Sequence, residues 1–158
     1  MLPTLDRIDF EILDLLQKNI LLPNKTIASQ VGLAPSSVHE RIKRLWESGI
    51  LRSASAEIDL KAALGLNIEA LLMIELSQHD RSTVEAFMQA VSDIPEVRLA
   101  FLVTGRYDLI VQVTVRDMQH LKDLALDHFT SRPNVTRIET SIIFQAQYSQ
   151  VDLKALAT

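Results

Sequence analysis

The chain has 158 residues, of which 47% are hydrophobic, and this composition predicts a packed core and excludes a disordered chain. It carries 16 lysines and arginines against 20 aspartates and glutamates, a formal net charge of -4, which excludes a generally basic nucleic-acid coat. Cysteine is absent, which excludes disulfides, thiolate metal sites and cysteine catalysis.

Targeting and membrane signals are weak throughout the sequence. Residues 1–4 lack the basic start and apolar stretch of a secretory signal. A notable apolar run, residues 70–74, lies between two glutamates and is far too short to cross a bilayer. We therefore expect a cytoplasmic protein.

Residues 5–18 are expected to form the first helix. Thr4 is available as its N-cap, and Asp6 and Asp9 would lie in its first turn. Apolar side chains recur along one side, which predicts a helix that covers the elements after it. This stripe consists of Leu5, Ile8, Ile12, Leu15 and Leu16.

Residues 25–46 have the pattern of a helix-turn-helix, because two short amphipathic helices are separated there by only three residues. Gly32 can end the first helix in the left-handed conformation. Pro35 suits the first turn of the second helix, where its missing N–H has no partner to lose.

The second of these helices has a polar face opposite its apolar stripe. In a recognition helix, short polar side chains near the start reach base edges, and basic side chains further along neutralise phosphates. An ordinary solvated face of a three-helix domain is the alternative interpretation. The predicted DNA-binding residues are Ser36, Ser37 and Glu40 for bases, Lys43 and Arg44 for phosphates, and His39 and Arg41 on the flanks.

Positive charge is confined to a small part of this acidic chain. Residues 36–46 contain three basic side chains and one acidic side chain. Because the rest of the protein repels DNA, one such patch should bind weakly and with strong salt dependence. We therefore expect an oligomer that presents several copies of the patch to double-stranded DNA.

The segment after the helix-turn-helix is expected to be a linker. Residues 50–58 alternate polar side chains with apolar or small ones, which predicts a strand, and residues 59–65 predict a short helical turn or hinge. The predicted domains are a helix-turn-helix domain over 1–49, a strand and hinge linker over 50–66, and an effector-binding and oligomerisation domain over 67–158.

The second half predicts the order strand, helix, strand, strand, helix, strand. Two-residue alternation marks the strands and helical spacing marks the helices, so the fold class is α+β with a βαββαβ, ferredoxin-like second domain. Such a sheet has helices on one face only. Its other face would still carry pairs such as Leu102 and Ile110, or Leu99 and Val111, which predicts dimerisation through the sheet rather than a monomer.

Catalytic and metal-binding patterns are not found. The four histidines form no metal-binding pair, and the four glycines form no phosphate-binding loop, so we expect neither an enzyme nor a cofactor. The predicted hairpin tip does carry Gly105, Arg106 and Asp108, which would suit a zwitterion. A hairpin also needs glycine and aspartate for its turn alone, which is the structural alternative.

Over nearly its full length the sequence resembles the leucine-responsive regulatory protein/AsnC family of bacterial and archaeal transcription regulators. Each motif is weak alone, but their order and spacing together are specific. The motifs are Leu5-Asp6-x-x-Asp9, Ile12-Leu13-x-x-Leu16, Val31-Gly32-Leu33 with Pro35, Val38-x-x-Arg41-Ile42-x-Arg44-Leu45, Gly49-Ile50, Ala56-x-Ile58-Asp59 ahead of Gly65, Thr104-Gly105-x-Tyr107-Asp108, and Thr140.

The resemblance implies a winged-type DNA-binding module, a small-molecule-sensing domain, and sheet-paired dimers that assemble into tetramers or octamers. It also implies an amino acid effector near the hairpin, at Gly105, Tyr107 and Asp108, with Thr140 and Arg106 as neighbours. Two positions depart from the family. Ala34 replaces a capping serine, and Arg106 stands where an acidic or polar residue is usual.

Two alternatives belong to other functional classes. Siroheme decarboxylases resemble these regulators and carry histidine and arginine in the sensing domain, whereas the corresponding residues 96–105 here contain Arg98 and no histidine. An amino-acid-binding interaction module, in which the helix-turn-helix only dimerises, is the other alternative, and the basic face of Lys43 and Arg44 disfavours it.

Overall fold

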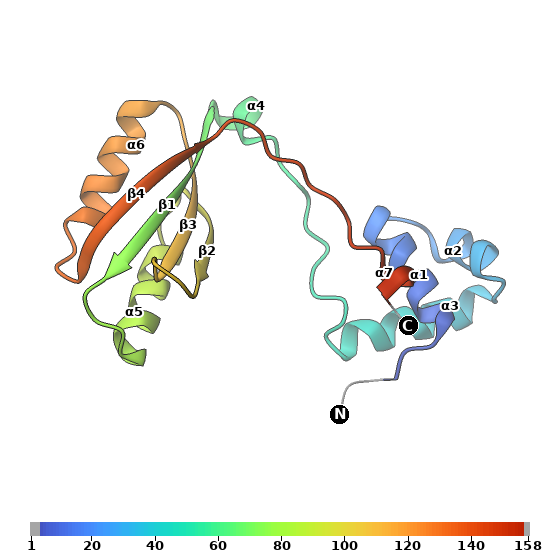
Figure 1. The fold of residues 1–158 in the computed structure, drawn as a ribbon. Coiled ribbons are helices and arrows are strands. Elements are labelled where there is room, and N and C mark those ends of the chain that lie inside the picture. The colour runs from blue at the N-terminus through green and yellow to red at the C-terminus, as the bar shows by residue number, and fades with distance from the viewer. Residues whose placement is uncertain (1–3, 157–158) are drawn as a thin grey trace. The chain divides into compact units, whose positions relative to one another are not determined.

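The computed structural model describes residues 4–156, which form two compact units. One unit comprises the residues up to Glu57 together with those from Gln147 onward, and the other comprises residues 58–146. The first is helical and the second is built on a four-stranded sheet (Figure 1). Within the described residues, no helix combines the length and apolarity needed to span a bilayer.

The helical unit contains α1 (Arg7–Lys18), α2 (Asn24–Val31), α3 (Pro35–Glu47) and the short α7 (Leu153–Leu156). The predicted apolar stripes meet in one core, which confirms the helix-turn-helix. Its buried side chains come from all three longer helices. Each helix has one apolar side, which it can bury only against the other helices. The buried side chains include Ile12, Ile27, Ala28, Val38 and Leu45.

Helix α1 begins at Arg7, two residues later than predicted, and its N-cap is Asp6 rather than Thr4. Asp6 Oδ1 accepts the Asp9 N–H at 2.9 Å, and Asp9 Oδ2 accepts the Asp6 N–H at 3.1 Å. This reciprocal capping box satisfies two backbone donors at once, whereas Thr4 could satisfy only one.

The turn of the helix-turn-helix is formed as predicted. Gly32 ends α2 with φ 70°, in the left-handed region, and Pro35 opens α3. The N-cap of α3 is Ala34, which has no side-chain hydrogen bond to give. Helix α3 therefore lacks the cap that a serine there would supply.

In the single chain, residues 52–59 form neither helix nor strand, so the predicted strand over residues 50–58 is wrong. Alternation can place side chains on two sides, but a strand also needs a backbone partner, and no described segment pairs with this one. The short α4 (Leu60–Leu64) follows, capped by Asp59 and ended by Gly65 at φ 68°, as the predicted helical turn requires.

The C-terminal segment belongs with the helical unit, although residues 67–158 were expected to form one domain. Gln150 Nε2 donates to the Gln17 carbonyl at 2.8 Å, Gln17 Nε2 donates to the Val151 carbonyl at 3.1 Å, and Leu153 packs on the helical core. Strand β4 ends at Ile143, and from Gln147 onward the chain belongs to the helical unit, where α1 offers apolar and polar contacts.

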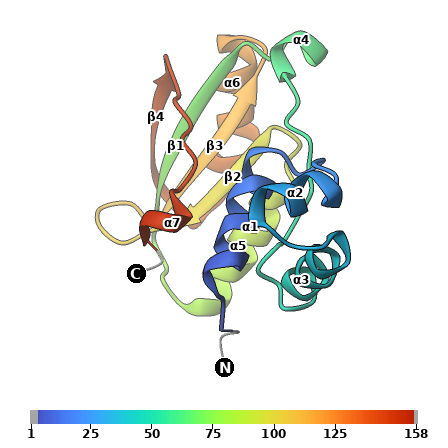
Figure 2. The same cartoon turned by 90° about the vertical axis from the view of Figure 1, so that its right-hand side faces the viewer.

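The sheet unit has the predicted βαββαβ order, and its four strands lie in the order β2-β3-β1-β4, with every neighbouring pair antiparallel (Figure 2). Helix α6 continues into a π-helical turn, η1. The elements are β1 (Ile68–Leu76), α5 (Arg81–Ser92), β2 (Val97–Leu102), β3 (Leu109–Val115), α6 (Met118–Ala125), η1 (Leu126–Thr130) and β4 (Val135–Ile143).

One face of the sheet forms the core with the two helices. Alternate residues of β1, such as Leu72 and Ile74, are fully buried against side chains such as Phe87 and Phe129. This arrangement confirms the predicted alternation in β1.

The two helices pack on one face of the sheet only and leave the other face open (Figure 1). Phe101 pairs with Ile110, and Leu99 pairs with Gln112, while Val111 faces the helical core. The most exposed apolar residues of this face are therefore Leu99 and Phe101, 51% and 46% exposed, beside Ile110. The two expected pairs are wrong because Leu102 pairs with Leu109 and Leu99 pairs with Gln112, so neither residue shares a face with its expected neighbour.

Candidate nucleic-acid interface and effector site

Helix α3 presents a continuous polar surface. Val38 and Leu45 fix its orientation because they are buried in the helical core. The opposite side therefore faces outward, as the helical period requires. Of the predicted DNA-binding residues, six are exposed, namely Ser36, Ser37, His39, Glu40, Lys43 and Arg44, and Arg41 is half-buried.

Arg41 and Arg44 share a buried carboxylate. Asp9 is 1% exposed and accepts Arg41 Nη1 at 2.7 Å, and Arg44 Nη2 lies 2.8 Å from both Asp9 oxygens. Arg41 Nη1 also donates to Asp6 Oδ2 at 2.7 Å. The two carboxylates, Asp6 first, raise the pKa of Arg41, and the capping N–H of Asp9 followed by Arg41 lowers the pKa of Asp6.

Other polar contacts of α3 are weaker. Lys43 Nζ lies 3.9 Å from a Glu47 oxygen, and both side chains are exposed. Asn24, in the first turn of α2, lies 3.4 Å from His39 Nδ1. Contacts of this length between exposed groups contribute little energy, so these side chains can reorient when a ligand approaches.

The β2–β3 hairpin contains the predicted effector residues, and the structure shows what Asp108 does there. Asp108 Oδ2 accepts the Leu76 N–H at 2.7 Å, its Oδ1 lies 2.9 Å from His79 Nδ1, and its backbone N–H donates to Ile74 at 2.9 Å. Gly105 has φ 120°, which side chains rarely allow. Asp108 therefore fixes the end of β1 against the hairpin.

A second group of side chains lies beside the hairpin. Arg106 Nη2 is 3.6 Å from a Glu139 oxygen, Arg137 donates to the same oxygen, and the Arg106 guanidinium lies 5.4 Å from the Tyr107 ring centre. The buried Tyr107 hydroxyl meets hydrogen-bond geometry with no described residue. The nearby Glu139 carboxylate nevertheless raises the pKa of Tyr107, and Tyr107 lowers that of Glu139.

Thr140 does not belong to this group. It pairs with Leu72, whose side chain faces the helical core, whereas Glu139 pairs with Met73 on the uncovered face. Successive residues of a strand point to opposite faces, so only one of the two can lie beside the Arg106 side chain. Arg137 and Glu139 were missed, although their two-residue spacing in the last strand places them on one face.

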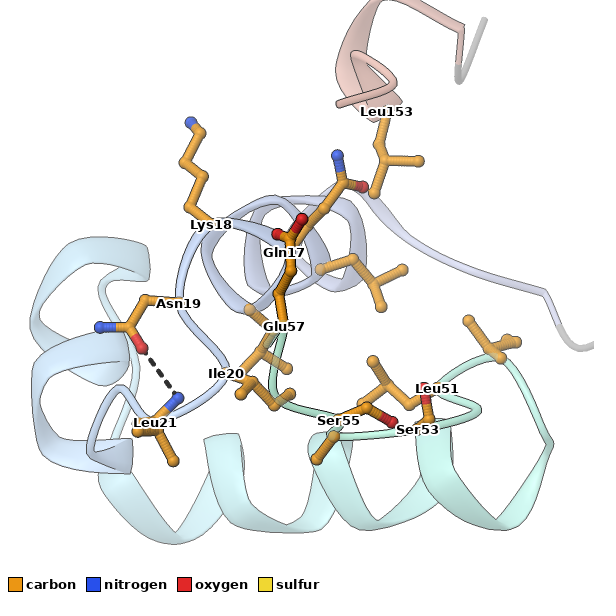
Figure 3. Close-up of a pocket in the computed structure, with 14 residues that line it drawn as sticks. Gln17, Lys18, Asn19, Ile20, Leu21, Leu51, Ser53, Ser55, Glu57 and Leu153 are labelled. Carbon is orange, nitrogen blue, oxygen red and sulfur yellow. Dashed lines mark hydrogen bonds between the residues drawn. The ribbon is translucent and has the colours of Figure 1, made fainter. Parts of the chain in front are cut away.

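The helical unit also has an open hollow of about 690 Å³. Figure 3 shows Gln17, Ile20, Leu51 and Leu153 around it, and the Asn19 side chain accepts the Leu21 N–H at 3.0 Å on its rim. None of the predicted DNA-binding or effector residues lines this hollow. Its wall includes residues 53–55 and Glu57, which have no regular structure.

Matches to family models agree with both units. Residues 5–52 match the model described as a winged helix-turn-helix DNA-binding domain, and residues 69–151 match the Lrp/AsnC ligand binding domain. A helix-turn-helix module joined to a ligand-binding βαββαβ module defines the class of ligand-binding transcription regulators. Within that class, the chain belongs to the Lrp/AsnC family.

Individual relatives cover almost the whole chain. The chain is 33% identical over 141 residues to the transcriptional regulator AldR of Mycolicibacterium smegmatis, covering 89% of this chain and 82% of AldR. It is 34% identical over 149 residues to the FL11 regulator of Pyrococcus furiosus, covering 94% and 95%. A Neisseria meningitidis transcriptional regulator solved in complex with L-Met has a TM-score of 0.85 and 28% identity, covering 94% of this chain and 96% of that one.

These relatives are transcription regulators rather than enzymes. The chain is accordingly a DNA-binding regulator, and the decarboxylase alternative is not supported.

Proposed function

We propose that this regulator binds DNA through the outer face of α3, assembles through the uncovered face of its sheet, and responds to an amino acid bound beside the β2–β3 hairpin. The observation that carries the proposal is the polar face of α3, which two buried side chains, Val38 and Leu45, hold outward. We expect this regulator to use an amino acid effector and no cofactor.

On the DNA-binding face, position along the helix separates the proposed roles. Ser36, Ser37 and Glu40 lie in the first half of α3 and would read base edges, with His39 beside them. Lys43 and Arg44 lie further along and would neutralise phosphates.

We further propose that two copies pair through their sheets. Leu99 and Phe101 would leave water on pairing, and the transfer of apolar surface from water drives association. A symmetric pair carries two recognition helices, which compensates for the small charge of each. Further association of dimers into tetramers or octamers would multiply the same effect.

The effector site is proposed at Arg106, Tyr107, Arg137 and Glu139. A guanidinium can bind a carboxylate in a fork, and the Glu139 carboxylate can accept from an ammonium group, so together they suit the main-chain groups of an amino acid. The Neisseria relative was solved with L-Met, which supports this ligand class. Asp108 would act indirectly, by fixing the hairpin that carries Arg106 and Tyr107.

The DNA-binding proposal is tested with the double substitution Lys43→Ala/Arg44→Ala. We expect the affinity for a mixed-sequence duplex, measured by fluorescence anisotropy, to fall at least tenfold, because each basic side chain accounts for about one phosphate contact. Arg81→Ala/Lys122→Ala, on helices of the sheet unit, is a control with the same charge change. An unchanged affinity in the α3 variant would refute the assignment of this face.

The effector proposal is tested by a thermal-shift screen of the twenty amino acids, because a ligand that binds only the folded state raises the melting temperature. The amino acid that gives a shift should lose it in Glu139→Gln but keep it in Glu85→Gln, a matched change on the exposed side of α5. Retention of the shift in Glu139→Gln would move the site elsewhere.

A further inference from the structure

The contact between α1 and α3 places a buried acidic residue directly behind the proposed DNA-binding face. Asp9 is almost completely inaccessible, yet it belongs to a cluster with two arginines of the recognition helix, Arg41 and Arg44. A buried carboxylate is costly unless it is paired, so the arginines stabilise it. The same contacts restrict what each arginine can do on the surface.

Building on the proposed DNA-binding face, we propose that Asp9 is a positioning residue that orients the Arg44 guanidinium for a DNA phosphate and withdraws Arg41 from DNA. The two arginines would then have different roles despite lying one helical turn apart on the same helix. This division separates them from Lys43, which has no partner closer than 3.9 Å among residues 4–156.

The withdrawal of Arg41 follows from its contacts. Its Nη1 donates to Asp6 and to Asp9, each at 2.7 Å, and its side chain is 24% exposed. Charge-assisted hydrogen bonds of this length are strong, and a phosphate would have to replace two of them. Arg41 therefore contributes to the joint between α1 and α3.

Arg44 is held at one end only. Its Nη2 lies 2.8 Å from both Asp9 oxygens, while 53% of its side chain is exposed. No described residue accepts from its Nε or Nη1, so the N–H groups of these two nitrogens remain available as donors. The N–H groups of Nη1 and Nε point in different directions, so each nitrogen can donate to a phosphate oxygen in a charge-assisted hydrogen bond while Nη2 stays on Asp9.

A surface hollow beside Arg44 supplies the space for such a phosphate. It measures about 270 Å³ and is lined by Glu40, Arg41, Lys43, Arg44 and Glu47. Lys43 lines the same hollow and can reach a neighbouring phosphate. Because Asp9 has already ordered the Arg44 side chain, binding would cost less conformational entropy than ordering a mobile arginine.

The alternative is that the Asp9 cluster is purely structural. The two explanations predict opposite changes in DNA affinity for Asp9→Asn, which removes a negative charge near DNA. Electrostatics without positioning predicts tighter DNA binding, whereas positioning predicts weaker binding and a salt slope shallower by about 0.9 for each recognition helix. Unfolding curves of the variant confirm that the comparison is made on folded protein.

Arg44→Lys gives a second test that does not alter a buried residue. It keeps the charge, but an ammonium group has a single nitrogen, so it cannot hold Asp9 with one nitrogen while another donates to a phosphate. We expect a loss of about tenfold in affinity for a mixed-sequence duplex, the size of one charge-assisted hydrogen bond. The matched control Lys43→Arg should change the affinity less than twofold.

The role of Arg41 is tested without changing the net charge, by Asp6→Asn/Arg41→Gln. Asparagine keeps the N-cap of α1, and we expect an unchanged salt slope because Arg41 touches no phosphate. A shallower slope in this variant would overturn the withdrawal of Arg41.

Wild-type affinity in Arg44→Lys, or tighter binding in Asp9→Asn, would overturn the positioning role. If Lys43→Ala weakens binding while Arg44→Lys does not, only the positioning role fails. If neither has an effect, the proposed DNA-binding face fails with it.

Discussion

Phe101→Lys should break the proposed sheet-to-sheet dimer. Phe101 lies on β2 and is 46% exposed, so a side chain that can bury roughly 200 Å² still has about 90 Å² to remove from water. At about 25 cal/mol per Å², this area is worth about 2 kcal/mol. A two-fold dimer contains the residue twice, so the loss is about 4 kcal/mol, or about 1000-fold in dissociation constant.

The assay is sedimentation velocity over a dilution series, in which the variant should approach the 17.8 kDa mass of one chain at concentrations where the wild type remains larger. Leu126→Lys is the matched control. Leu126 lies on the helical layer of the same unit and is 47% exposed, so the substitution changes charge and apolar surface similarly without touching the sheet. Equal dissociation constants for Phe101→Lys and wild type would refute the interface.

Two further predictions concern helix ends. Ala34→Ser should stabilise the helical unit by about 1 kcal/mol, because it supplies the side-chain cap that α3 lacks, and chemical denaturation would show the gain; no gain would mean that the cap geometry is not reached. Asp80 caps α5, and its hydrogen bonds, first from Ser82 and then from Thr83, lower its pKa from 3.8 to about 2. The folded state therefore holds the charged carboxylate, and its contribution is present above about pH 4 and is lost as the pH falls towards 2. In Asp80→Asn, the melting temperature should fall less than in the wild type as the pH is lowered from about 4 to about 2. An equally steep fall in both proteins would contradict this assignment.

The helices and the sheet could be predicted because their periodicity reports directly on burial. Leu72 and Ile74 alternate with half-buried residues, and Val38 and Leu45 recur at helical spacing, so each element shows its inner side in the sequence. Local conformation was equally readable at Gly32 and Pro35, where backbone geometry depends on one residue.

Features that depend on a distant partner could not be predicted. The strand expected over residues 50–58 lacks a pairing segment, and the contacts of Gln150 with α1 join residues 133 positions apart. The pairing of Asp9 with Arg44 spans 35 positions, so the sequence shows two arginines in a basic patch and cannot show that both are bonded to a buried carboxylate.

The effector site was predicted in part. The hairpin position of Arg106 and Tyr107 follows from local turn signals, but their neighbours depend on the register between strands that are not adjacent in sequence. A difference of one residue in β4 exchanges Thr140 for Glu139 on the uncovered face.

The salt dependence of DNA binding tests the central claim most directly, because its slope measures how many phosphates the protein neutralises. For a dimer with two recognition helices, each contributing Lys43 and Arg44, replacement of both residues by alanine should make the slope of log affinity against log salt shallower by about 3.6. An unchanged slope in a folded, dimeric variant would contradict the assignment of DNA binding to this face of α3.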